Sequence, residues 1–295
     1  MTTFSELPGV GEPRSPRPRA LIVTIFGLYA RDTSGWLSVA SLIRLMAGLG
    51  ADEPAVRSSI SRLKRRGLLD PRRMGGAAGY GLSAAGRQVL AEGDRRIFSR
   101  PRAQLSDGWL LAVFSVPEAE RNQRHALRSR LSGLGFGTVS AGVWIAPGHF
   151  ADETSEVLER SGLTGYVALF RADYLAFGDV AAQLGRWWDL DRLQCMYHAF
   201  REAYGPLLER WAGGRGGSDA AAFATYIRAL TDWRRLPFLD PGLPAELLPP
   251  RWQGAGAADL FGQLQAHLDR PARRHVHAVM AGETGQASEA LEATQ

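Results

Sequence analysis

The chain has 295 residues and contains one cysteine, Cys195. A single cysteine excludes an intramolecular disulfide framework and a cysteine-rich zinc module, and it fits a reducing compartment. The longest apolar run, residues 20–30, is far shorter than the roughly 18 residues of a membrane span. Residues 1–13 are acidic and polar, and they lack the basic segment with which a signal peptide begins. We therefore predict a cytoplasmic protein.

The sequence also lacks the motifs that carry common catalytic chemistries. It contains no phosphate-binding loop, no Gly-x-Ser-x-Gly and no cluster of histidines and carboxylates. Cys195 with His198, and His275 with His277, have the spacing of half a metal site, but the sequence offers neither pair further ligands. These absences predict that the chain is not an enzyme and that it binds no metal or cofactor.

Lysine is almost absent, since Lys64 is the only one, so arginine supplies nearly all of the positive charge. Residues 14–102 contain 17 arginines and lysines against 6 acidic residues, a net charge of +11, whereas residues 103–295 carry a net charge of −4. Codon bias would explain the preference for arginine, but it does not explain why acidic residues are scarce in the same segment. The asymmetry predicts an N-terminal domain that binds a polyanion.

Residues 14–100 have the element order of a winged helix-turn-helix domain, preceded by a proline- and arginine-rich arm at 13–18. Ser38 and Asp52 are predicted to cap the second and third helices, and Pro71 marks its strand as an edge strand. The predicted elements are helices at 19–31, 39–48 and 54–66, a wing made of a strand at 68–73, a turn at 75–79 and a strand at 80–82, and an outgoing helix at 84–98.

The helix at 54–66 points most directly to DNA. Val56, Ile60 and Leu63 share one apolar face because they are spaced four and three residues apart. Small hydroxyls between basic residues on the other side suit a helix that lies in a major groove, and basic side chains on the wing suit phosphate contact. The alternative is a solvated charged face, which any amphipathic helix has. The candidate DNA contacts are Arg57, Ser58, Ser61, Arg62, Lys64 and Arg65 on the helix and Arg72 and Arg73 on the wing.

Residues 106–175 predict a small domain of strands and helices in the order β-α-β-β-α-β, which is the ferredoxin-like pattern. We expect this domain to mediate dimer or interdomain contacts. Its predicted strands lie at 109–116, 138–141, 143–145 and 166–170, and its helices at 118–131 and 150–160.

Residues 180–270 predict a helical domain rich in aromatic side chains, and residues 271–295 a flexible tail. The fold class predicted for the whole chain is therefore α+β, with an N-terminal winged helix, a central ferredoxin-like domain and a C-terminal helical domain. The helices expected in the third domain lie at 191–211, 219–234 and 257–268, with a proline-rich loop at 237–250.

Six stretches carry a resemblance to a known family, namely Leu21–Gly27, Ala55–Leu63, Tyr80–Ser83, Phe136-Gly137, Gly142–Pro147 and Asp232–Trp252. In these stretches and in the order of its elements the chain resembles the PaaX family, bacterial transcriptional repressors of phenylacetic acid catabolism. The resemblance covers about residues 16–270. It implies a homodimer that binds double-stranded operator DNA and is released by an acyl-CoA thioester, typically phenylacetyl-CoA. The wing turn, rich in glycine and alanine, and the Asp232-Trp233 pair depart from the family pattern.

An acyl-CoA effector requires apolar, aromatic walls for its acyl group and arginines for its phosphates. The third domain supplies both residue types. The alternative is that the aromatic side chains belong to the core and that the arginines pair with Asp232, Asp240 or Glu246. The candidate effector-binding residues are Trp187, Trp188, Tyr197, Arg228, Trp233, Arg234 and Arg235.

Two other functions remain as alternatives. The resemblance implies a central domain similar to a small CRISPR-associated nuclease fold, whose metal carboxylate would follow the first strand. This sequence has Ser115-Val116-Pro117 there, with no acid, so a metal-dependent nuclease is only the alternative. A nucleoid-type DNA binder would show little sequence preference, whereas serines between arginines indicate base reading. We expect operator binding as a homodimer on a palindrome, because one short helix reads only a few base pairs.

Overall fold

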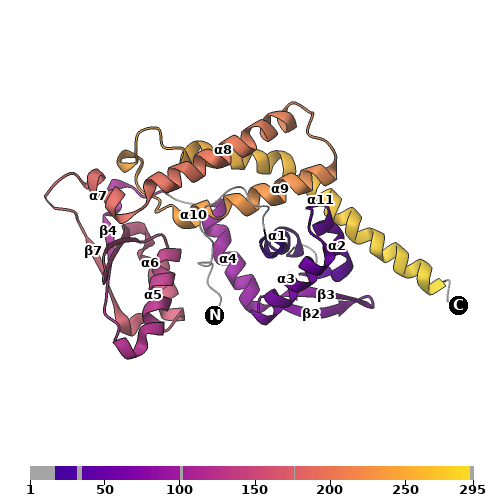
Figure 1. Ribbon diagram of the computed structural model, residues 1–295, viewed down its shortest axis with the longest axis horizontal. Helices are drawn as coiled ribbons and strands as arrows, with labels where there is room; N and C mark the ends of the chain where they lie inside the picture. Colours follow the sequence, from indigo (N-terminus) through magenta and orange to yellow (C-terminus); the bar gives the residue numbers. More distant parts are fainter. Residues whose placement is uncertain (1–16, 32–34, 100–101, 176, 293–295) are drawn as a thin grey trace. The chain divides into compact units, whose positions relative to one another are not determined.

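The computed structural model describes residues 17–31, 35–99, 102–175 and 177–292. The chain divides into two compact units. The helical unit comprises the described residues up to Arg95 together with 200–233 and the residues from 256 onward. The sheet unit comprises residues 96–199 and 234–255. Helices and two antiparallel sheets occur in one chain (Figure 1), so the α+β class predicted from the sequence is confirmed.

The helical unit begins with three helices. Ser38 and Asp52 cap the second and third as expected: the Ser38 side chain accepts from the Ser41 N–H and the Asp52 side chain from the Ala55 N–H. The first helix ends in a π-helical turn, η1, that the sequence pattern did not predict. The bounds are α1 (Pro18–Ile25), η1 (Phe26–Ala30), α2 (Val39–Ala47) and α3 (Glu53–Arg65). The predicted arm at 13–18 falls mostly outside the described residues, and Pro18 already belongs to α1.

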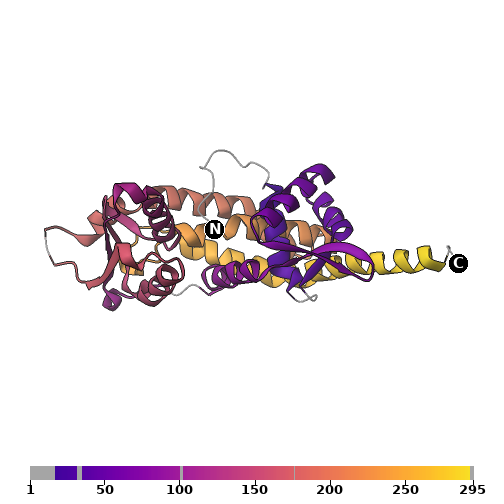
Figure 2. The ribbon, with the colours of Figure 1, turned by 90° about the horizontal axis from the view of Figure 1, so that it is seen from below.

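A three-stranded antiparallel sheet combines β1, which precedes α2, with the β2–β3 hairpin, which follows α3. Its strand order is β1-β3-β2, so Pro71 lies on an edge strand as predicted. The β2–β3 hairpin is tighter than expected. Its turn is only Gly75-Gly76, since Met74 pairs with Ala77, and both glycines have positive φ, which a two-residue hairpin turn requires. Figure 2 shows the hairpin beside the three helices. The bounds are β1 (Trp36–Ser38), β2 (Leu69–Met74) and β3 (Ala77–Leu82), followed by α4 (Ala84–Phe98).

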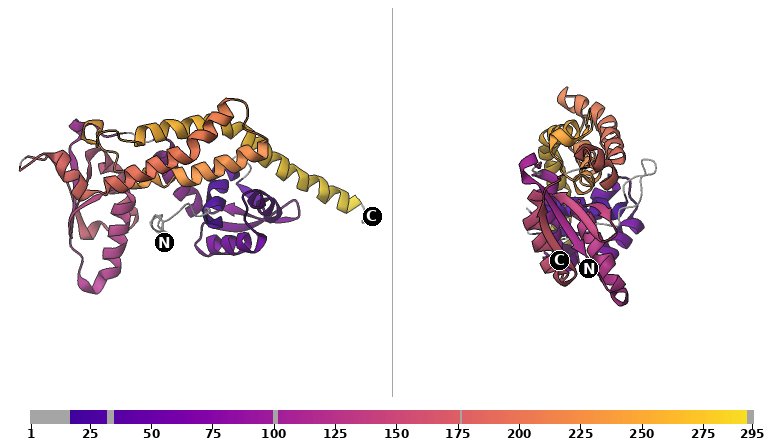
Figure 3. Two further views of the ribbon diagram at one scale, coloured as in Figure 1. Left: turned by 45° about the horizontal axis from the view of Figure 1, so that its top comes forward. Right: turned by 90° about the vertical axis from the view of Figure 1, so that its left-hand side faces the viewer.

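Three long helices complete the helical unit: the later part of α8 (Leu190–Ala212), α9 (Asp219–Trp233) and most of α11 (Gly254–Glu292). Trp233 of α9 stacks on Phe261 of α11 with ring centroids 5.0 Å apart. α9 also packs against α1, and Figure 3 shows these helices alongside one another.

The predicted tail after residue 270 is wrong for the described residues, because α11 continues to Glu292 through Pro271. The apolar stripe of this helix does not stop at the proline. Ala272 and Val276 are buried one turn apart, in line with Leu264 and Leu268. Burial of this face offsets the one hydrogen bond that a proline removes inside a helix.

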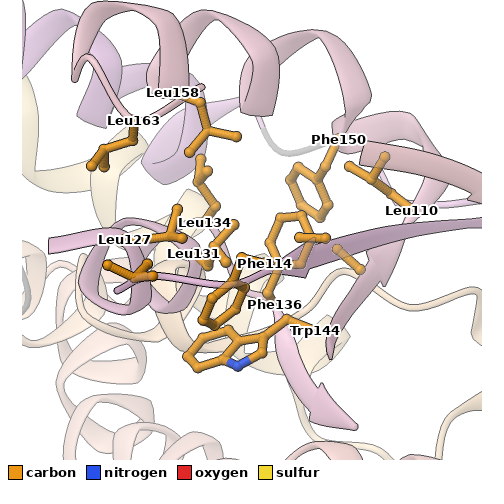
Figure 4. Close-up of a cluster of buried hydrophobic side chains, with 13 residues drawn as sticks. Leu110, Phe114, Leu127, Leu131, Leu134, Phe136, Trp144, Phe150, Leu158 and Leu163 are labelled. Carbon is orange, nitrogen blue, oxygen red and sulfur yellow. The ribbon is translucent and has the colours of Figure 1, made fainter. Parts of the chain in front are cut away.

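The sheet unit contains a four-stranded antiparallel sheet with the order β5-β6-β4-β7. Helices α5 and α6 cover one face of it (Figure 1) and bury alternate side chains of β4, Leu110, Ala112 and Phe114. Figure 4 shows this core, in which leucines of both helices meet the aromatic rings of the sheet. The bounds are β4 (Trp109–Phe114), α5 (Arg121–Gly133), β5 (Gly137–Ser140), β6 (Val143–Pro147), α6 (Ala151–Arg160) and β7 (Val167–Ala172).

The other face of the sheet is covered in part by α7 (Val180–Trp187) and by the proline-rich segment that contains the short helix α10 (Leu236–Leu239). Trp109 and Ile145 are buried there against Leu184 and Trp188. The segment 180–270, expected as one helical domain, is thereby divided, since 180–199 and 234–255 belong to the sheet unit and the rest to the helical unit.

Candidate nucleic-acid interface

α3 has one buried and one exposed face. Val56, Ser59, Ile60 and Leu63 are buried, which leaves the remaining polar side chains in solvent. Among the described residues, no acidic side chain forms an ion pair with Arg62, Lys64 or Arg65. The exposed face therefore presents hydrogen-bond donors and positive charge that no contact within the described chain uses. Its residues are Ser58, Ser61, Arg62, Lys64 and Arg65.

Arg57 differs from the other candidates on this helix. Its guanidinium binds the Glu53 carboxylate one turn earlier, with Nη2 2.6 Å and Nε 2.7 Å from Oε1. Both side chains are more than half exposed, so the pair is weak and water competes for it. A phosphate could replace Glu53 as the partner of Arg57, whereas Arg62 and Arg65 have no acidic partner to displace among the described residues.

The two hairpin arginines have different surroundings. Arg72 lies across β3, where a Cβ on Gly81 would be 3.0 Å from its Nε. The Arg73 Nη2 donates to the Gly76 carbonyl in the turn, at 3.3 Å. Successive residues of a strand point to opposite faces, so Arg72 and Arg73 leave the hairpin on opposite sides. Only one of them can point toward a given groove of DNA.

The sequence analysis missed Trp36, which supports the hairpin from β1. Its Nε1 donates to the Arg72 carbonyl at 3.3 Å, and its ring lies over Gly79, where a Cβ would clash at 2.5 Å. Glycine at 79 therefore permits the close approach of the indole. The strand register pairs Trp36 with Gly81, and the indole reaches diagonally to Gly79. The sequence carries no signal for this contact, because the register is a tertiary property.

The candidate effector residues fall in both units. Trp187 and Trp188 contact Trp109 in the sheet unit, with ring centroids 5.9 and 6.3 Å away. Trp188 is buried and its Nε1 donates to the Gly135 carbonyl at 2.9 Å. Trp187, half-buried, also lies edge-on to Tyr174. These two indoles form one aromatic cluster with the sheet.

Three other candidates, Tyr197, Arg234 and Arg235, also belong to the sheet unit. The buried Tyr197 hydroxyl donates to the buried Asp240 carboxylate at 2.6 Å, and its ring lies edge-on to Trp252. Burial lowers the pKa of Arg234 to about 10, with the like charge of Arg235 as the second cause. The guanidinium stays charged at neutral pH, so the pair concentrates positive charge in a partly buried place.

Arg228 and Trp233 belong to the helical unit. Trp233 is buried between Phe200 and Phe261, at 5.5 and 5.0 Å between ring centroids. The Arg228 Nη2 donates to the Leu49 carbonyl, in the turn between α2 and α3, at 3.2 Å. The seven candidates are thus divided between the two units.

Arg96, which the sequence analysis did not single out, is a buried arginine of the sheet unit with several hydrogen-bond partners. Its side chain is 8% exposed and binds both oxygens of Glu153 at 3.1 and 3.2 Å. It also donates to the carbonyls of Gly133 and Leu134, and it lies over the Phe150 ring at 5.3 Å. A buried guanidinium needs all of these partners.

The described residues lack two further features. No group of three or more histidines, cysteines, aspartates or glutamates within them is placed to hold a metal ion. No helix in that part of the chain combines the length and hydropathy needed to cross a bilayer.

Three family models match consecutive parts of the chain. A PaaX-like protein model matches residues 17–86, the PaaX protein central Cas2-like domain matches 102–184, and the PaaX-like protein C-terminal domain matches 188–278. Between them they cover most of the sequence in the expected order. The chain belongs to the PaaX family.

Individual relatives agree with this assignment. The Transcriptional repressor PaaX of Escherichia coli (strain K12) is 26% identical over 245 residues, which span 82% of this chain and 77% of that protein. A solved structure of an uncharacterized protein from Mycobacterium tuberculosis matches with a TM-score of 0.55 and 25% identity, over 90% of this chain and all of that chain. The PaaX-like match at 17–86 contains the whole exposed face of α3 and the β2–β3 hairpin.

Proposed function

We propose that this chain is a transcriptional repressor that binds double-stranded operator DNA through α3 and the β2–β3 hairpin. The observation that carries the proposal is the exposed face of α3, where Arg62, Lys64 and Arg65 have no acidic partner among the described residues. Membership of the PaaX family and similarity to a transcriptional repressor support it.

The proposed architecture has a winged helix-turn-helix domain at 14–100 and a ferredoxin-like domain at 106–175. The short turn between α2 and α3 and the hairpin after α3 support the first assignment. The element order from β4 to β7 and the strand order β5-β6-β4-β7 support the second.

In this reading α3 enters the major groove. Arg62 and Arg65 supply bidentate donors that suit guanine, and the small Ser58 and Ser61 side chains allow the helix to approach the bases closely. Lys64, Arg57, Arg72 and Arg73 are better suited to phosphates, which fix the register of the protein without reading sequence. A homodimer would place two such helices on a palindromic site and double the length of sequence read.

The proposed effector is an acyl-CoA thioester such as phenylacetyl-CoA. The aromatic cluster around Trp187 and the partly buried charges of Arg234 and Arg235 support an aromatic acyl group with an anionic tail. A ligand shifts a binding equilibrium only through its different affinity for the two states, so the thioester must bind the DNA-free state more tightly.

A regulator of this kind is not an enzyme, and it acts where the chromosome lies, in line with the cytoplasmic location predicted from the sequence. No carboxylate stands at Ser115-Val116-Pro117, directly after β4, which argues against a metal-dependent nuclease. Cleavage of duplex DNA by the purified protein with added divalent cations would instead favour the nuclease.

The DNA-binding proposal is tested with two substitutions and two duplexes, one selected by the protein from a randomised pool and one shuffled. Arg62→Ala should weaken binding to the selected duplex by about 1–3 kcal/mol and relax base preference at one position. Arg72→Ala should weaken binding to both duplexes and reduce the salt dependence. Equal losses on both duplexes for both variants would remove the assignment of reader and phosphate contact.

The effector proposal is tested by release of the selected duplex from the full-length chain. Phenylacetyl-CoA should release it and free phenylacetate should not, because only the thioester carries phosphates for the arginines. Equal release by both compounds would exclude a role for the CoA portion.

A further inference from the structure

α9 contacts the proposed DNA-reading elements at two points on one of its faces. Arg228 and Thr231 are three residues apart and so are neighbours on the helix surface. Thr231 contacts α1 and Arg228 contacts the turn between α2 and α3. All of these residues belong to the helical unit. One face of α9 therefore reaches both the first helix and the turn that leads into α3.

The contact with α1 is buried and its polarity can be assigned. The hydroxyls of Thr24 and Thr231 lie 2.8 Å apart, and each residue is 3% exposed. The Thr24 hydroxyl donates to the Ala20 carbonyl at 3.1 Å. A hydroxyl has a single proton, so Thr231 must donate to Thr24. This bond fixes α9 against α1.

The contact with the turn involves a main-chain carbonyl directly before α3. The N–H groups of Leu49, Gly50 and Ala51 donate back to carbonyls of α2, whereas the Leu49 carbonyl accepts from Arg228 Nη2 at 3.2 Å. Gly50 has a φ of +81°, a conformation that glycine adopts readily.

α9 also makes a polar contact with α8. The Tyr204 hydroxyl donates to the Asp232 carboxylate at 2.7 Å. Asp232 is one turn after Arg228, and burial together with Asp232 raises the pKa of Tyr204 while the nearby Arg228 opposes that rise. Tyr204, Asp232 and Arg228 thus form a line of polar groups from α8 to the α2–α3 turn.

We propose that Arg228 is a positioning residue that holds the α2–α3 turn, and with it the reading helix α3, in the orientation set by α8 and α9. The inference rests on the proposed DNA-binding function and adds a residue that specifies its geometry. Arg228 is otherwise exposed, so its hydrogen bond adds little to global stability, and its role is to restrict the turn.

The test compares Arg228→Gln, Arg228→Lys and Arg210→Gln in the full-length chain. Arg210 is an exposed arginine of α8, and its replacement removes the same charge without a contact to the turn. One readout is hydrogen exchange of the amides from Leu49 to the first turn of α3. The other is the affinity for the duplex selected by the wild-type protein, relative to a shuffled duplex at the same salt concentration.

Arg228→Gln should raise the exchange of these amides, and it should weaken binding to the selected duplex about three- to tenfold more than Arg210→Gln does, as the loss of one hydrogen bond implies. Arg228→Lys keeps a charged donor and should recover most of both losses. Thr231→Val should raise exchange in α1 more than in the turn, which separates the two contacts.

Unchanged exchange in the turn, with Arg228→Gln and Arg210→Gln equal on both duplexes, would overturn the proposal. If the wild-type protein selects no duplex, the proposed function fails, and hydrogen exchange still decides whether Arg228 restricts the turn.

Discussion

α3 and α5 are both 13-residue helices with four basic residues each, yet they use these residues differently. In α5, Arg124 donates to the Glu118 carboxylate and to the Val116 carbonyl, and Arg128 lies over the Trp144 ring at 5.6 Å. In α3, Arg62 and Arg65 form no ion pair with any described acidic residue. The two helices lie in different units.

The comparison shows that basic composition does not by itself identify a nucleic-acid surface. α5 has no acidic residue at all and is the more basic helix by sequence, but two of its arginines are held by its own unit. An arginine without such contacts keeps its donors for a partner, and the exposed serines of α3 leave room for that partner. Substitutions in the two units should therefore affect different properties, namely stability in the sheet unit and DNA binding in the helical unit.

The largest effect is expected for Arg96→Met in the sheet unit. The change leaves the Glu153 carboxylate and the carbonyls of Gly133 and Leu134 without a buried donor. We expect a loss of about 3–5 kcal/mol in the free energy of unfolding, as for other broken buried pairs. Chemical denaturation of the full-length chain measures it.

Arg95→Met is the matched control, since Arg95 is exposed and adjacent to Arg96. It should change stability by no more than about 0.5 kcal/mol. Equal effects of the two substitutions would mean that the contacts of Arg96 do not stabilise the sheet unit.

The second prediction sets α3 against α5 with two double variants that each remove two charges. Arg62→Gln with Arg65→Gln should weaken binding to the selected duplex by about 1–3 kcal/mol per base-reading arginine and leave the denaturation midpoint almost unchanged. Arg124→Gln with Arg128→Gln should lower stability by about 1–2 kcal/mol, because two hydrogen bonds of Arg124 and the cation–π contact of Arg128 are lost.

The α5 variant should bind DNA nearly as the wild-type chain does once it is folded. If both double variants weaken DNA binding equally at several salt concentrations, total charge rather than the exposed face of α3 determines affinity, and the contrast between the helices disappears.

The third prediction concerns Tyr197, whose hydroxyl donates a hydrogen bond within the sheet unit. Tyr197→Phe removes one donor from the buried Asp240 carboxylate, which keeps the Gly242 N–H, and it should cost about 1–3 kcal/mol of stability. Tyr174→Phe is the control, because the Tyr174 ring contacts Trp187 and no hydrogen bond of its hydroxyl is found in the described residues. Unchanged thermal unfolding of the Tyr197 variant would show that the hydroxyl is not needed by the fold.

The smallest effect is a pH dependence in the helical unit. Burial lowers the pKa of His275, whose ring lies 5.3 Å from that of Phe223, although Asp219 opposes the shift. The unfolded chain therefore takes up this proton first as the pH falls below about 6.5, and stability decreases through the folded pKa. His275→Gln should flatten the stability profile below about pH 6.5, whereas His277→Gln, at an exposed position, should not.

Much of the local structure followed from the sequence. The caps at Ser38 and Asp52, the edge position of Pro71 and the apolar face of α3 depend on residues a few positions apart, so short-range rules were sufficient. The prediction of a flexible tail after residue 270 was wrong, because the apolar stripe of α11 continues through Pro271 to Val276.

The site was only partly accessible from the sequence. Periodicity identified which side chains of α3 are exposed, because that face depends only on the helix and its apolar stripe. Periodicity could not separate the arginines of α3 from those of α5, since the partners of Arg124 and Arg128 come from other elements of the sheet unit.

The sequence by itself determined the family, the α+β class, the helix caps and the basic face of α3, because each is encoded in the identity and spacing of neighbouring residues. Only the tertiary structure decided that α9 packs on α1, that Arg228 holds the Leu49 carbonyl and that Arg96 is buried with Glu153. Arg228 and Leu49 are 179 positions apart in the sequence, and Arg96 and Glu153 are 57 positions apart. At such separations, burial and hydrogen-bond satisfaction in the folded chain select the partner, and no local pattern records that choice.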